Sequence, residues 1–465
     1  MRSERACAIV AALLWACAPA WAQLQVSGNG RWFEKDGKTI ALFGSGIWTI
    51  IPDVSVDIEE HNAWYAKWRA NANRVALYSF FNAVSDGKGI GPWARTGPGL
   101  ANDGGLKFDL TKPNEDFWNR ARAYFASCER HGICVWLQIF CEPYVEEGKD
   151  RWYINPFNSD NNVNSIPGLP GGAVSGEEAF YDPDNPALMT VQNALVTRLL
   201  DETAGRFGNI VYEIGNEINM DSVTSKAAEW QRHWVEFFRA HEKERGVPLF
   251  LSNNTRRALF EHDAAGFDVV NHHGFWPLRV KGADPIELAR TVSENVRQDF
   301  AEFGKPIVNS RPCSDPDRTN YPDIATKDEG RRLYWSYFMS GGHIIGFRTT
   351  NESWKGGTTA EEIIKNLHVF IAETPLARMA PSQDIIEGNA LCLSAPGEGC
   401  ALYFPVGGSA MLRNPGFTQG ATVRWYDPRE GTWTAPRALP PGTDITLTAP
   451  DSHDWAVLIS AGTGQ

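Results

Sequence analysis

The sequence lacks the motifs that identify several common enzyme classes. It contains no Gly-x-Ser-x-Gly nucleophile motif, no phosphate-binding loop ending in Gly-Lys-Ser/Thr and no His-Glu-x-x-His zinc motif. It also lacks a glycine-rich dinucleotide fingerprint after a first strand. These absences argue against an ordinary serine esterase, a P-loop nucleotidase, a zinc peptidase and a nicotinamide-dependent oxidoreductase. We therefore expect no cofactor and no catalytic metal.

Positive charge is scarce relative to negative charge. The chain has 44 Lys and Arg against 56 Asp and Glu, giving a formal net charge of −12. An acidic surface repels phosphate backbones and anionic lipid, which disfavours nucleic-acid and membrane-surface partners. Beyond the N-terminus, no apolar run approaches the ~20 residues that a membrane-spanning helix needs.

The N-terminal segment has the pattern of a secretory signal peptide. Arg2 and Arg5 precede a short apolar run at residues 6–20, and Ala20-Trp21-Ala22 is a small-x-small cleavage site. This pattern predicts removal of residues 1–22 and a secreted or periplasmic mature protein.

Cysteines are few, and none has zinc-finger spacing. Eight occur in the whole chain, two of them inside the expected signal peptide. Cys392 and Cys400 flank a Pro-Gly-Glu-Gly turn. Export would permit a disulfide between them, whereas buried free thiols are the alternative, and the sequence does not decide between the two.

The chain between residues 23 and 380 alternates short β-branched runs with longer helical patterns, which is typical of βα units around a parallel sheet. Eight such units predict an α/β fold of the (β/α)8 TIM-barrel type. The predicted strands are Thr39–Trp48, Asn73–Tyr78, Cys134–Phe140, Ile210–Glu217, Pro248–Asn253, Val269–Gly274, Pro306–Arg311 and His343–Arg348.

Two further segments depart from this alternation. Residues 142–186 form a long connection rich in Asn, Pro and Gly. In a barrel it would lie on the active-site face, so we expect it to shape the substrate cleft. Residues 381–465 contain short strand-like runs split by Gly/Pro turns, which predicts a small all-β sandwich domain.

The central functional feature is Asn216-Glu217 at the end of the predicted fourth strand. Barrel enzymes place their chemistry at the carboxyl ends of the strands. A Glu there can protonate a glycosidic oxygen if its surroundings raise its pKa. We predict that Glu217 is a general acid/base and that Asn216 binds substrate beside it. Glu213, deeper on the same strand face, is predicted to pair with Arg74.

These motifs together resemble those of clan A glycoside hydrolases, the cellulase-like and apiosidase-like barrel enzymes. The matching motifs are Gly44-Ser45-Gly46-Ile47-Trp48, Asn71-Ala72-Asn73-Arg74, Gly215-Asn216-Glu217, His272-His273-Gly274 and Gly341-Gly342-His343. Val423–Gly431 and Asp454–Leu458 resemble a collagen-binding-type domain that often follows such barrels. The resemblance covers nearly all of the mature chain. We do not infer collagen binding for this protein from the name of that domain.

The resemblance implies roles for particular residues. Arg74 would orient the nucleophile, a bidentate task suited to guanidinium, and His272 or His273 would line the sugar site. Tryptophans that follow strands or lie in the long connection are candidate stacking platforms for sugar rings. These are Trp48, Trp152, Trp276 and Trp354.

One departure from the family pattern matters more than the matches. Retaining enzymes of the clan carry a nucleophilic Glu at the end of the seventh strand, where this sequence has Arg311. Another carboxylate would have to act with Glu217, or Arg311 binds an anionic group of the substrate, or the site binds sugar without cutting it. Candidate second carboxylates are Glu142, Asp315, Asp317 and Glu352.

The sequence therefore predicts a secreted glycoside hydrolase that acts on a carbohydrate substrate. A non-hydrolytic carbohydrate-binding pseudoenzyme is the alternative. The sugar, the linkage, the stereochemical outcome and the oligomeric state are not determined by these patterns.

Overall fold

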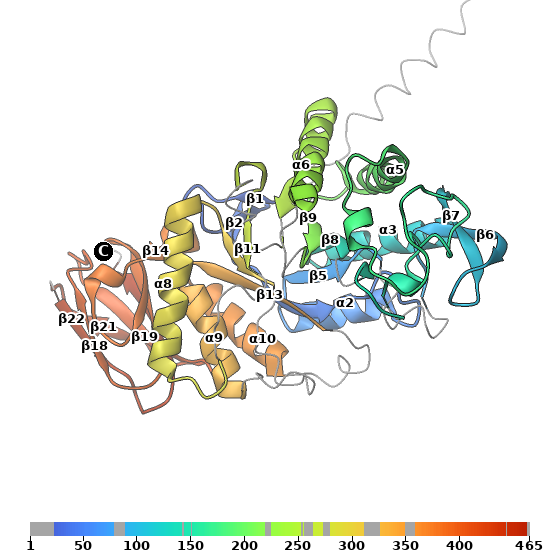
Figure 1. Cartoon of the computed structure of the whole chain (residues 1–465). Helices are drawn as coiled ribbons and strands as arrows, with labels where there is room; N and C mark the ends of the chain where they lie inside the picture. The colour runs from blue at the N-terminus through green and yellow to red at the C-terminus, as the bar shows by residue number, and fades with distance from the viewer. Residues whose placement is uncertain are drawn as a thin grey trace, which may run out of the picture.

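The computed structural model describes residues 23–78, 89–141, 144–149, 151–218, 225–252, 254, 264–272, 280–310, 326–348, 359–442 and 444–462. The expected signal peptide lies outside them. An α/β region comes first along the chain, and an all-β region follows it, at the left of Figure 1. Among the described residues, no helix is both long enough and apolar enough to cross a membrane.

Eight parallel strands form the centre of the α/β region. They are β4 (Phe43–Ile47), β5 (Ala72–Ala76), β8 (Cys134–Cys141), β9 (Ile210–Asn216), β10 (Phe250–Ser252), β11 (Val270–His272), β12 (Ile307–Asn309) and β13 (Gly342–Arg348). They pair as two four-stranded sheets, in the orders β5-β8-β9-β10 and β11-β12-β13-β4. All eight overlap the predicted strand segments, and their order follows the chain, as in a (β/α)8 barrel.

The hydrogen-bonded sheet does not close into a complete barrel. An isolated bridge between Ser252 and Val269 connects β10 to the residue before β11. Between β4 and β5 no ladder forms, and the Tyr65 hydroxyl lies between them instead. It accepts from the Ser45 backbone N–H at 2.5 Å and donates to the Ala72 carbonyl at 2.7 Å. The expectation of a closed barrel is therefore corrected to two sheets that meet at this seam.

Helices pack around the parallel strands. They are α2 (Ile58–Lys67), α3 (Glu115–Arg130), α5 (Pro186–Thr203), α6 (Ser225–Arg245), α8 (Pro285–Phe303), α9 (Lys327–Met339) and α10 (Thr359–Ile371), with the short α4 (Glu177–Phe180). Local sequence sets several of their starts. Asp57, Asn185 and Asp284 accept hydrogen bonds from first-turn N–H groups, and Thr326 forms a capping box with Glu329. These caps satisfy backbone donors that a helix leaves without partners.

A small antiparallel sheet covers the amino-terminal ends of the parallel strands. It consists of β1 (Gln25–Val26), β2 (Phe33–Lys35) and β3 (Lys38–Ile40). Leu24 and Phe33 pack with Val211, Phe250 and neighbouring apolar side chains from the strands. This end of the sheet is thus closed by apolar packing, which leaves the opposite end for the functional site.

A β-hairpin lies between the second and third parallel strands. It comprises β6 (Trp93–Leu100) and β7 (Leu106–Pro113), which the sequence analysis did not anticipate. Phe108 of β7 exchanges backbone hydrogen bonds with the long connection, donating to the Asn161 carbonyl at 2.8 Å and accepting from the Val163 N–H at 2.9 Å. The hairpin and the connection therefore form one unit, at the right of Figure 1.

The long connection is ordered mainly by asparagine side chains rather than by regular structure. The amide groups of Asn155, Asn158, Asn161 and Asn162 donate to carbonyls of the connection itself. Trp152, expected to be a sugar platform, is instead fully buried, and its indole N–H donates to the Pro170 carbonyl at 3.1 Å. That expectation is corrected: Trp152 packs the interior of the loop.

The all-β region contains two antiparallel sheets. The larger has the order β14-β16-β17-β23-β19-β20, with β21 also paired to β19, and the smaller has the order β15-β18-β22. The strands are β14 (Ala380–Pro381), β15 (Ile386–Gly388), β16 (Leu391–Ala395), β17 (Gly399–Phe404), β18 (Ser409–Arg413), β19 (Ala421–Asp427), β20 (Thr432–Trp433), β21 (Arg437–Leu439), β22 (Asp444–Thr448) and β23 (Trp455–Ala461). The predicted boundary at residue 380 and the description as a separate sandwich domain stay predictions.

Alternate residues of the larger sheet serve two different cores. On β17, Ala401 and Tyr403 pack with the helices of the α/β region, whereas Leu402 and Phe404 pack with the smaller sheet. This follows from the two-residue period of a strand. Cys392 and Cys400, left open as disulfide or thiols, are buried free thiols in the second core.

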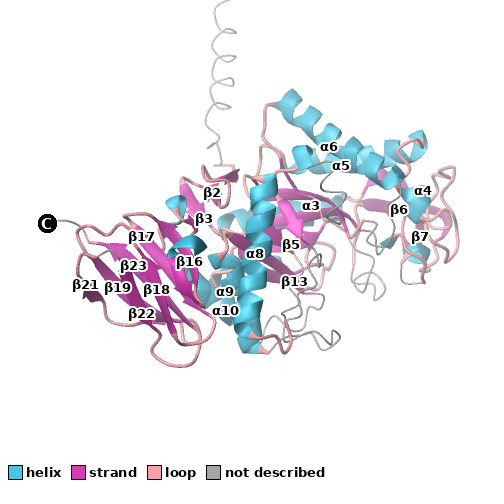
Figure 2. Ribbon diagram, turned by 60° about the vertical axis from the view of Figure 1, so that its left-hand side comes forward, coloured by secondary structure: helices cyan, strands magenta, loops and turns pink. Residues whose placement is uncertain are grey.

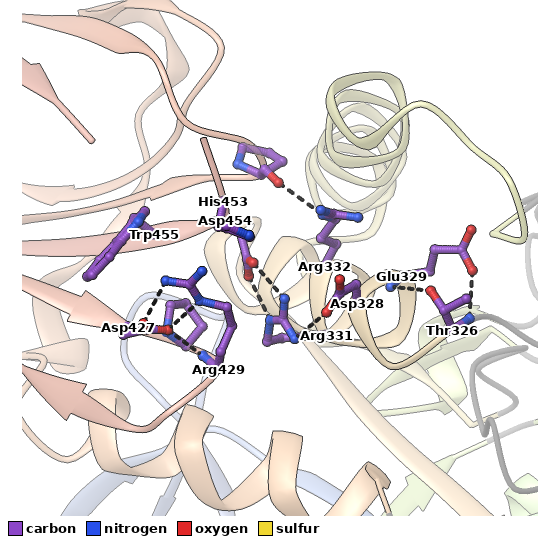
Figure 3. Close-up of polar contacts among 12 residues, drawn as sticks. Thr326, Asp328, Glu329, Arg331, Arg332, Asp427, Arg429, His453, Asp454 and Trp455 are labelled. Carbon is purple, nitrogen blue, oxygen red and sulfur yellow. Dashed lines mark hydrogen bonds and ion pairs between the residues drawn. The ribbon is translucent and has the colours of Figure 1, made fainter. Parts of the chain in front are cut away.

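The first core continues across the boundary between the two regions. Trp335 of α9 stacks on Tyr403 at a ring-centroid distance of 5.3 Å, and Phe370 of α10 stacks on Trp433 at 5.3 Å. Beside these rings the buried Arg331 and Asp454 form a bidentate ion pair, with N–O distances of 2.6 and 2.8 Å (Figure 3). The larger sheet is therefore docked on α9 and α10 by both apolar and ionic contacts.

Candidate active site at the end of β9

The interior of the parallel sheets changes from apolar to polar along the strands. Near their amino-terminal ends, Ala72, Val211 and Val269 belong to one apolar cluster. Two residues farther along the same strands, Arg74, Glu213 and Asn271 occupy the equivalent inward positions. Because successive inward side chains are two residues apart, the sequence builds a polar layer directly above an apolar floor.

A buried ion pair forms the centre of this polar layer. The Arg74 guanidinium donates to both Glu213 carboxylate oxygens, from Nε at 3.1 Å and from Nη2 at 2.5 Å. The indole N–H of Trp136 and the amide of Asn271 also donate to Glu213 Oε2, at 2.9 and 3.0 Å. Both charged side chains are fully buried. The predicted pairing of Glu213 with Arg74 is present in the structure.

Opposing effects act on the Glu213 carboxyl group. Burial raises its pKa, while the Arg74 charge and the hydrogen bonds from Arg74, Trp136 and Asn271 oppose that rise. A group surrounded by four donor contacts is committed to accepting hydrogen bonds. Glu213 therefore holds the side chains of the polar layer beneath the site in place.

Asn216 extends this network towards the end of β9. Its side-chain oxygen accepts a hydrogen bond from Arg74 Nη2 at 2.5 Å, and its amide nitrogen contacts the Cys141 sulfur at 3.5 Å. Burial, and then the nearby Glu217 charge, raise the pKa of the Cys141 thiol, which keeps it protonated. The structure thus places Arg74 under Asn216, next to the residue predicted to be catalytic.

Glu217 follows β9 with an unusual backbone conformation. Its φ angle is 55°, in the left-handed region that residues with a Cβ atom seldom adopt. Its backbone N–H donates to the Asn254 side-chain oxygen at 3.2 Å, and the Asn254 amide donates to the Ser310 hydroxyl at 2.8 Å. Asn254 and Ser310 follow the fifth and seventh strands, so residues from three strand ends hold this backbone in place.

Trp48 lies at the same end of the sheets but exposes little of its ring. Its indole N–H donates to the Gln138 side-chain oxygen at 2.6 Å, and the ring stacks on Tyr144 at a centroid distance of 5.9 Å. The residue is 8% exposed. Trp48 thus forms part of the wall of the site, with Tyr144, Ala76 and Cys141.

His272 is directed away from this group of residues. Its neighbour Asn271 faces Glu213, so the His272 ring falls on the outer face of β11, where its Nε2 atom lies 2.6 Å from the Asp299 carboxylate of α8. Both side chains are buried. The expectation that His272 lines the sugar site is not supported by this placement.

Several predicted residues lie outside the described residues. They are Glu142, His273, Trp276, Arg311 and Trp354, together with Asp315, Asp317 and Glu352. The described part of the site therefore consists of Glu217 and the hydrogen-bonded side chains below and beside it.

The sequence analysis did not single out several residues that the structure brings into the site. They are Trp136, Gln138, Cys141, Asn254, Asn271 and Ser310. A usable clue was present, because each is on or just after a predicted parallel strand. Polar residues at such positions converge at the carboxyl edge of the sheet.

The described site can hold a carboxyl group in a fixed place beside a hydrogen-bonding amide. Glu217 is partly exposed, whereas Arg74, Glu213 and Asn216 beneath it are buried. Among the described residues, no three His, Cys, Asp or Glu side chains gather as a metal-binding group. The chemistry offered by these side chains is proton transfer and hydrogen bonding.

The architecture is one found among barrel glycoside hydrolases. A structure titled glycoside hydrolase matches with a TM-score of 0.67 at 12% identity, over 96% of this chain and 99% of that chain. A glycoside hydrolase family 5 structure from Bacteroides vulgatus matches with a TM-score of 0.65 at 12% identity, over 95% of this chain and 93% of that chain. Each match covers so much of this chain that it must include part of the all-β region as well as the α/β region. At such low identity the similarity shows a shared fold.

At the level of sequence, one family model matches the chain. It is described as a domain of unknown function, DUF6298, and it matches residues 56–260. This segment contains Arg74, Glu213, Asn216 and Glu217. No curated protein matches the sequence.

Proposed function

We propose that the protein is a glycoside hydrolase in which Glu217 is the catalytic acid/base. The observation that carries the proposal is the position of Glu217. It is a partly exposed carboxyl group at the carboxyl end of the fourth parallel strand, fixed in a left-handed conformation above the buried Arg74–Glu213 pair. The fold shared with glycoside hydrolases supports the same conclusion.

In the proposed reaction Glu217 donates its proton to the glycosidic oxygen as the bond to the anomeric carbon breaks. Water then supplies the hydroxyl group of the new reducing end, and its other proton returns to a carboxylate of the enzyme. Asn216 binds a sugar hydroxyl next to that bond, and its orientation is set by the hydrogen bond from Arg74.

This chemistry needs a second carboxylate, because the sequence has Arg311 where the predicted seventh strand ends. Glu142, Asp315, Asp317 and Glu352 are the candidates. A separation from Glu217 of about 5–5.5 Å would give retention, and one of about 6.5–9.5 Å would give inversion. Arg311 itself is suited to bind an acidic group on the sugar.

We further propose that residues 1–22 direct export and that the mature protein acts outside the cytoplasm. The basic residues, the apolar run and the Ala20-Trp21-Ala22 site motivate this. N-terminal sequencing of protein from the culture medium or periplasm would test it, with Gln23 expected as the first residue.

The activity is tested by incubating the mature protein with a panel of polysaccharides and nitrophenyl glycosides. Glu217→Gln should reduce sugar release by about a hundredfold or more, as expected for loss of a general acid. Glu178→Gln is the matched control, because Glu178 is an exposed residue of α4. Near-normal turnover in Glu217→Gln would rule out the assignment.

A carbohydrate-binding protein without hydrolytic activity is the second candidate, and Arg311 is the observation that favours it. Calorimetry on the same panel separates the two. Binding of an oligosaccharide without any release of reducing ends by the wild type would establish the binding protein. Sugar release by the wild type and the control variant would exclude it.

A further inference from the structure

Two side chains of β8 contact residues of the candidate active site. Gln138 accepts a hydrogen bond from the indole N–H of Trp48 at 2.6 Å, and the Cys141 sulfur accepts from the side-chain amide of Asn216 at 3.5 Å. Both β8 residues are buried, with 1% and 6% of their surface exposed. Each is therefore placed to act on the site through the side chain that it contacts.

The Gln138 amide is paired on one side only. Because an indole N–H can only donate, the Oε1 atom must face Trp48, and this fixes the orientation of the amide. The Nε2 atom is then buried, and it has no hydrogen-bond partner among the described residues. An unpaired buried donor costs free energy, so stability alone does not explain a glutamine at this position. The contact that explains it is the one that holds the Trp48 ring.

The Asn216 amide is held from two sides. Arg74 can only donate, so the Asn216 Oδ1 atom must face its guanidinium, at 2.5 Å. That orientation turns Nδ2 towards Cys141, which is also the register partner of Asn216 between β8 and β9. Thiol sulfur is a weak acceptor. The contact therefore orients Nδ2 and still allows it to donate to a stronger acceptor, such as a sugar hydroxyl.

We propose that Gln138 and Cys141 are positioning residues for the active site. Gln138 sets the Trp48 ring as the wall against which the sugar packs, and Cys141 aims the Asn216 amide at the sugar hydroxyl beside the bond to be cut. This inference rests on the proposed function, because it assigns both contacts to the substrate of Glu217. Neither side chain touches the reacting atoms, so both act through a neighbour.

The two contacts should affect different kinetic constants. An aromatic wall contacts the sugar in the bound substrate and in the transition state alike, so displacement of Trp48 should raise KM and leave kcat unchanged. A hydrogen bond to the hydroxyl next to the scissile bond strengthens in the transition state, so misalignment of Asn216 should lower kcat. General damage to the fold would not separate the two constants in this way.

For Gln138 the test is Gln138→Met, assayed on a glycoside that the wild type cleaves. This variant should raise KM about fivefold or more and leave kcat within about twofold. Gln192→Met is the matched control. Gln192 of α5 is also buried and accepts from the indole N–H of Trp230 on α6 at 2.8 Å, where these two helices lie side by side (Figure 2). Its amide also donates to the Phe180 carbonyl at 3.1 Å, so the control should lower Tm at least as much while keeping the wild-type KM.

For Cys141 the test compares Cys141→Ala with Cys141→Ser. Alanine removes the acceptor and should lower kcat about fivefold or more, whereas serine keeps an acceptor and should hold kcat within about threefold of wild type. Cys134→Ala is the matched control, because Cys134 is buried at the start of the same strand, in the apolar cluster beneath the site. It loses the same thiol group and should keep the wild-type kcat and KM.

An unchanged KM in Gln138→Met, or the same rise in Gln192→Met, would overturn the assignment of Gln138. An unchanged kcat in Cys141→Ala, or an equal loss in Cys134→Ala, would overturn that of Cys141. If the wild type binds a panel oligosaccharide without cleaving it, the assignment of Cys141 fails together with that of Glu217. Calorimetry should then still show weaker binding by Gln138→Met than by Gln192→Met. A wild type that neither binds nor cleaves any panel carbohydrate would overturn both this proposal and the proposed function.

Discussion

At the scale of single residues, Glu217 combines a reactive side chain with a strained backbone. A left-handed conformation costs roughly 1–2 kcal/mol for a residue with a Cβ atom. Glycine would fit this position without that cost, yet the sequence has Glu, and Asn254 and Ser310 hold its backbone in place. Strain retained at a partly exposed carboxyl group is typical of residues kept for function rather than for stability.

Glu217→Gly should therefore leave the free energy of unfolding unchanged or raise it by up to about 1 kcal/mol, because relief of strain offsets the extra entropy of glycine in the unfolded chain. Asp36→Gly is the control, since Asp36 has a φ angle of 53° in the β2–β3 turn. Urea unfolding of both variants checks this. A large loss of stability in Glu217→Gly alone would show that Glu217 is a structural residue.

The residue scale also shows the limits of motif reasoning. The positions of Arg74 and Glu213 could be predicted from strand alternation, and those of Asn216 and Glu217 from their place at the carboxyl end of the fourth strand. The orientation of His272 could not be predicted in this way. It depends on Asn271, which occupies the inward position on β11 and leaves His272 on the outer face.

At the scale of elements, the seam between β4 and β5 depends on glycine. A Cβ atom at Gly44 would lie 1.7 Å from the Ala72 carbonyl oxygen and 2.5 Å from the Tyr65 hydroxyl oxygen. A Cβ atom at Gly46 would lie 2.0 Å from the Asn73 side-chain oxygen. The Gly44-Ser45-Gly46 motif is thus explained by the close approach of two strands that Tyr65 bridges.

Gly44→Ala should lower the free energy of unfolding by at least about 2 kcal/mol, because the methyl group must displace backbone rather than a flexible side chain. Gly28→Ala is the matched control, since a Cβ atom there would meet nothing within 4 Å. Chemical denaturation of the two variants measures the difference. Equal stabilities would mean that the seam can relax without cost.

The connection after β8 illustrates why elements without periodicity escape prediction. Its asparagines could be recognised as typical loop residues. However, their side chains bond to carbonyls several residues away, and the connection also pairs with the β6–β7 hairpin, which is still farther away in the sequence. Those contacts bury Trp152, which a pattern of isolated tryptophans could not reveal.

At the scale of the whole molecule, the all-β region is joined to the helices by a desolvated interface. The Arg331–Asp454 pair is 3% and 0% exposed, and the Tyr403 hydroxyl also donates to Asp454 at 3.1 Å. Arg332 donates to the Pro405 carbonyl at 3.0 Å in the same interface (Figure 3). We therefore expect the two regions to unfold together rather than as independent modules.

Arg331→Met should destabilise the protein by roughly 3–5 kcal/mol, because it leaves the Asp454 charge buried without its cation. The double variant Arg331→Met/Asp454→Leu should recover much of this loss, since no buried charge remains. Arg378→Met is the control, because the Arg378–Glu398 pair is exposed and worth less than about 1 kcal/mol. Calorimetric unfolding checks all three. A double variant no more stable than the single one would contradict the role of the charge.

Stability of the whole molecule should also depend on pH through His343. This fully buried ring accepts from the Leu42 N–H at 3.0 Å through Nδ1, and its Nε2 donates to the Arg31 carbonyl at 2.9 Å, which requires the neutral form. Burial lowers the pKa of His343 from 6.5 to about 4. Between these values the unfolded chain binds a proton that the folded protein excludes, so stability falls as pH falls.

The expected loss between pH 7 and pH 4 is on the order of 3 kcal/mol from this residue. His343→Gln should show a shallower pH dependence whatever its absolute stability, and buried His368 should keep its own contribution, since burial also lowers its pKa to about 4. Urea unfolding across this pH range compares the slopes. Parallel slopes for the variant and the wild type would exclude His343 as a source.

The sequence by itself determined the order and position of the eight parallel strands, the Glu213–Arg74 pairing and the place of Glu217 at a strand end. These follow from local periodicity and from the rule that parallel strands share one carboxyl edge. The tertiary structure decided what depends on contacts between distant segments. It set the Tyr65 bridge at the open seam, the partner of His272, the burial of Trp152 and the docking of Tyr403 on Trp335. Local patterns specify which face of an element is apolar, but not which other element covers it.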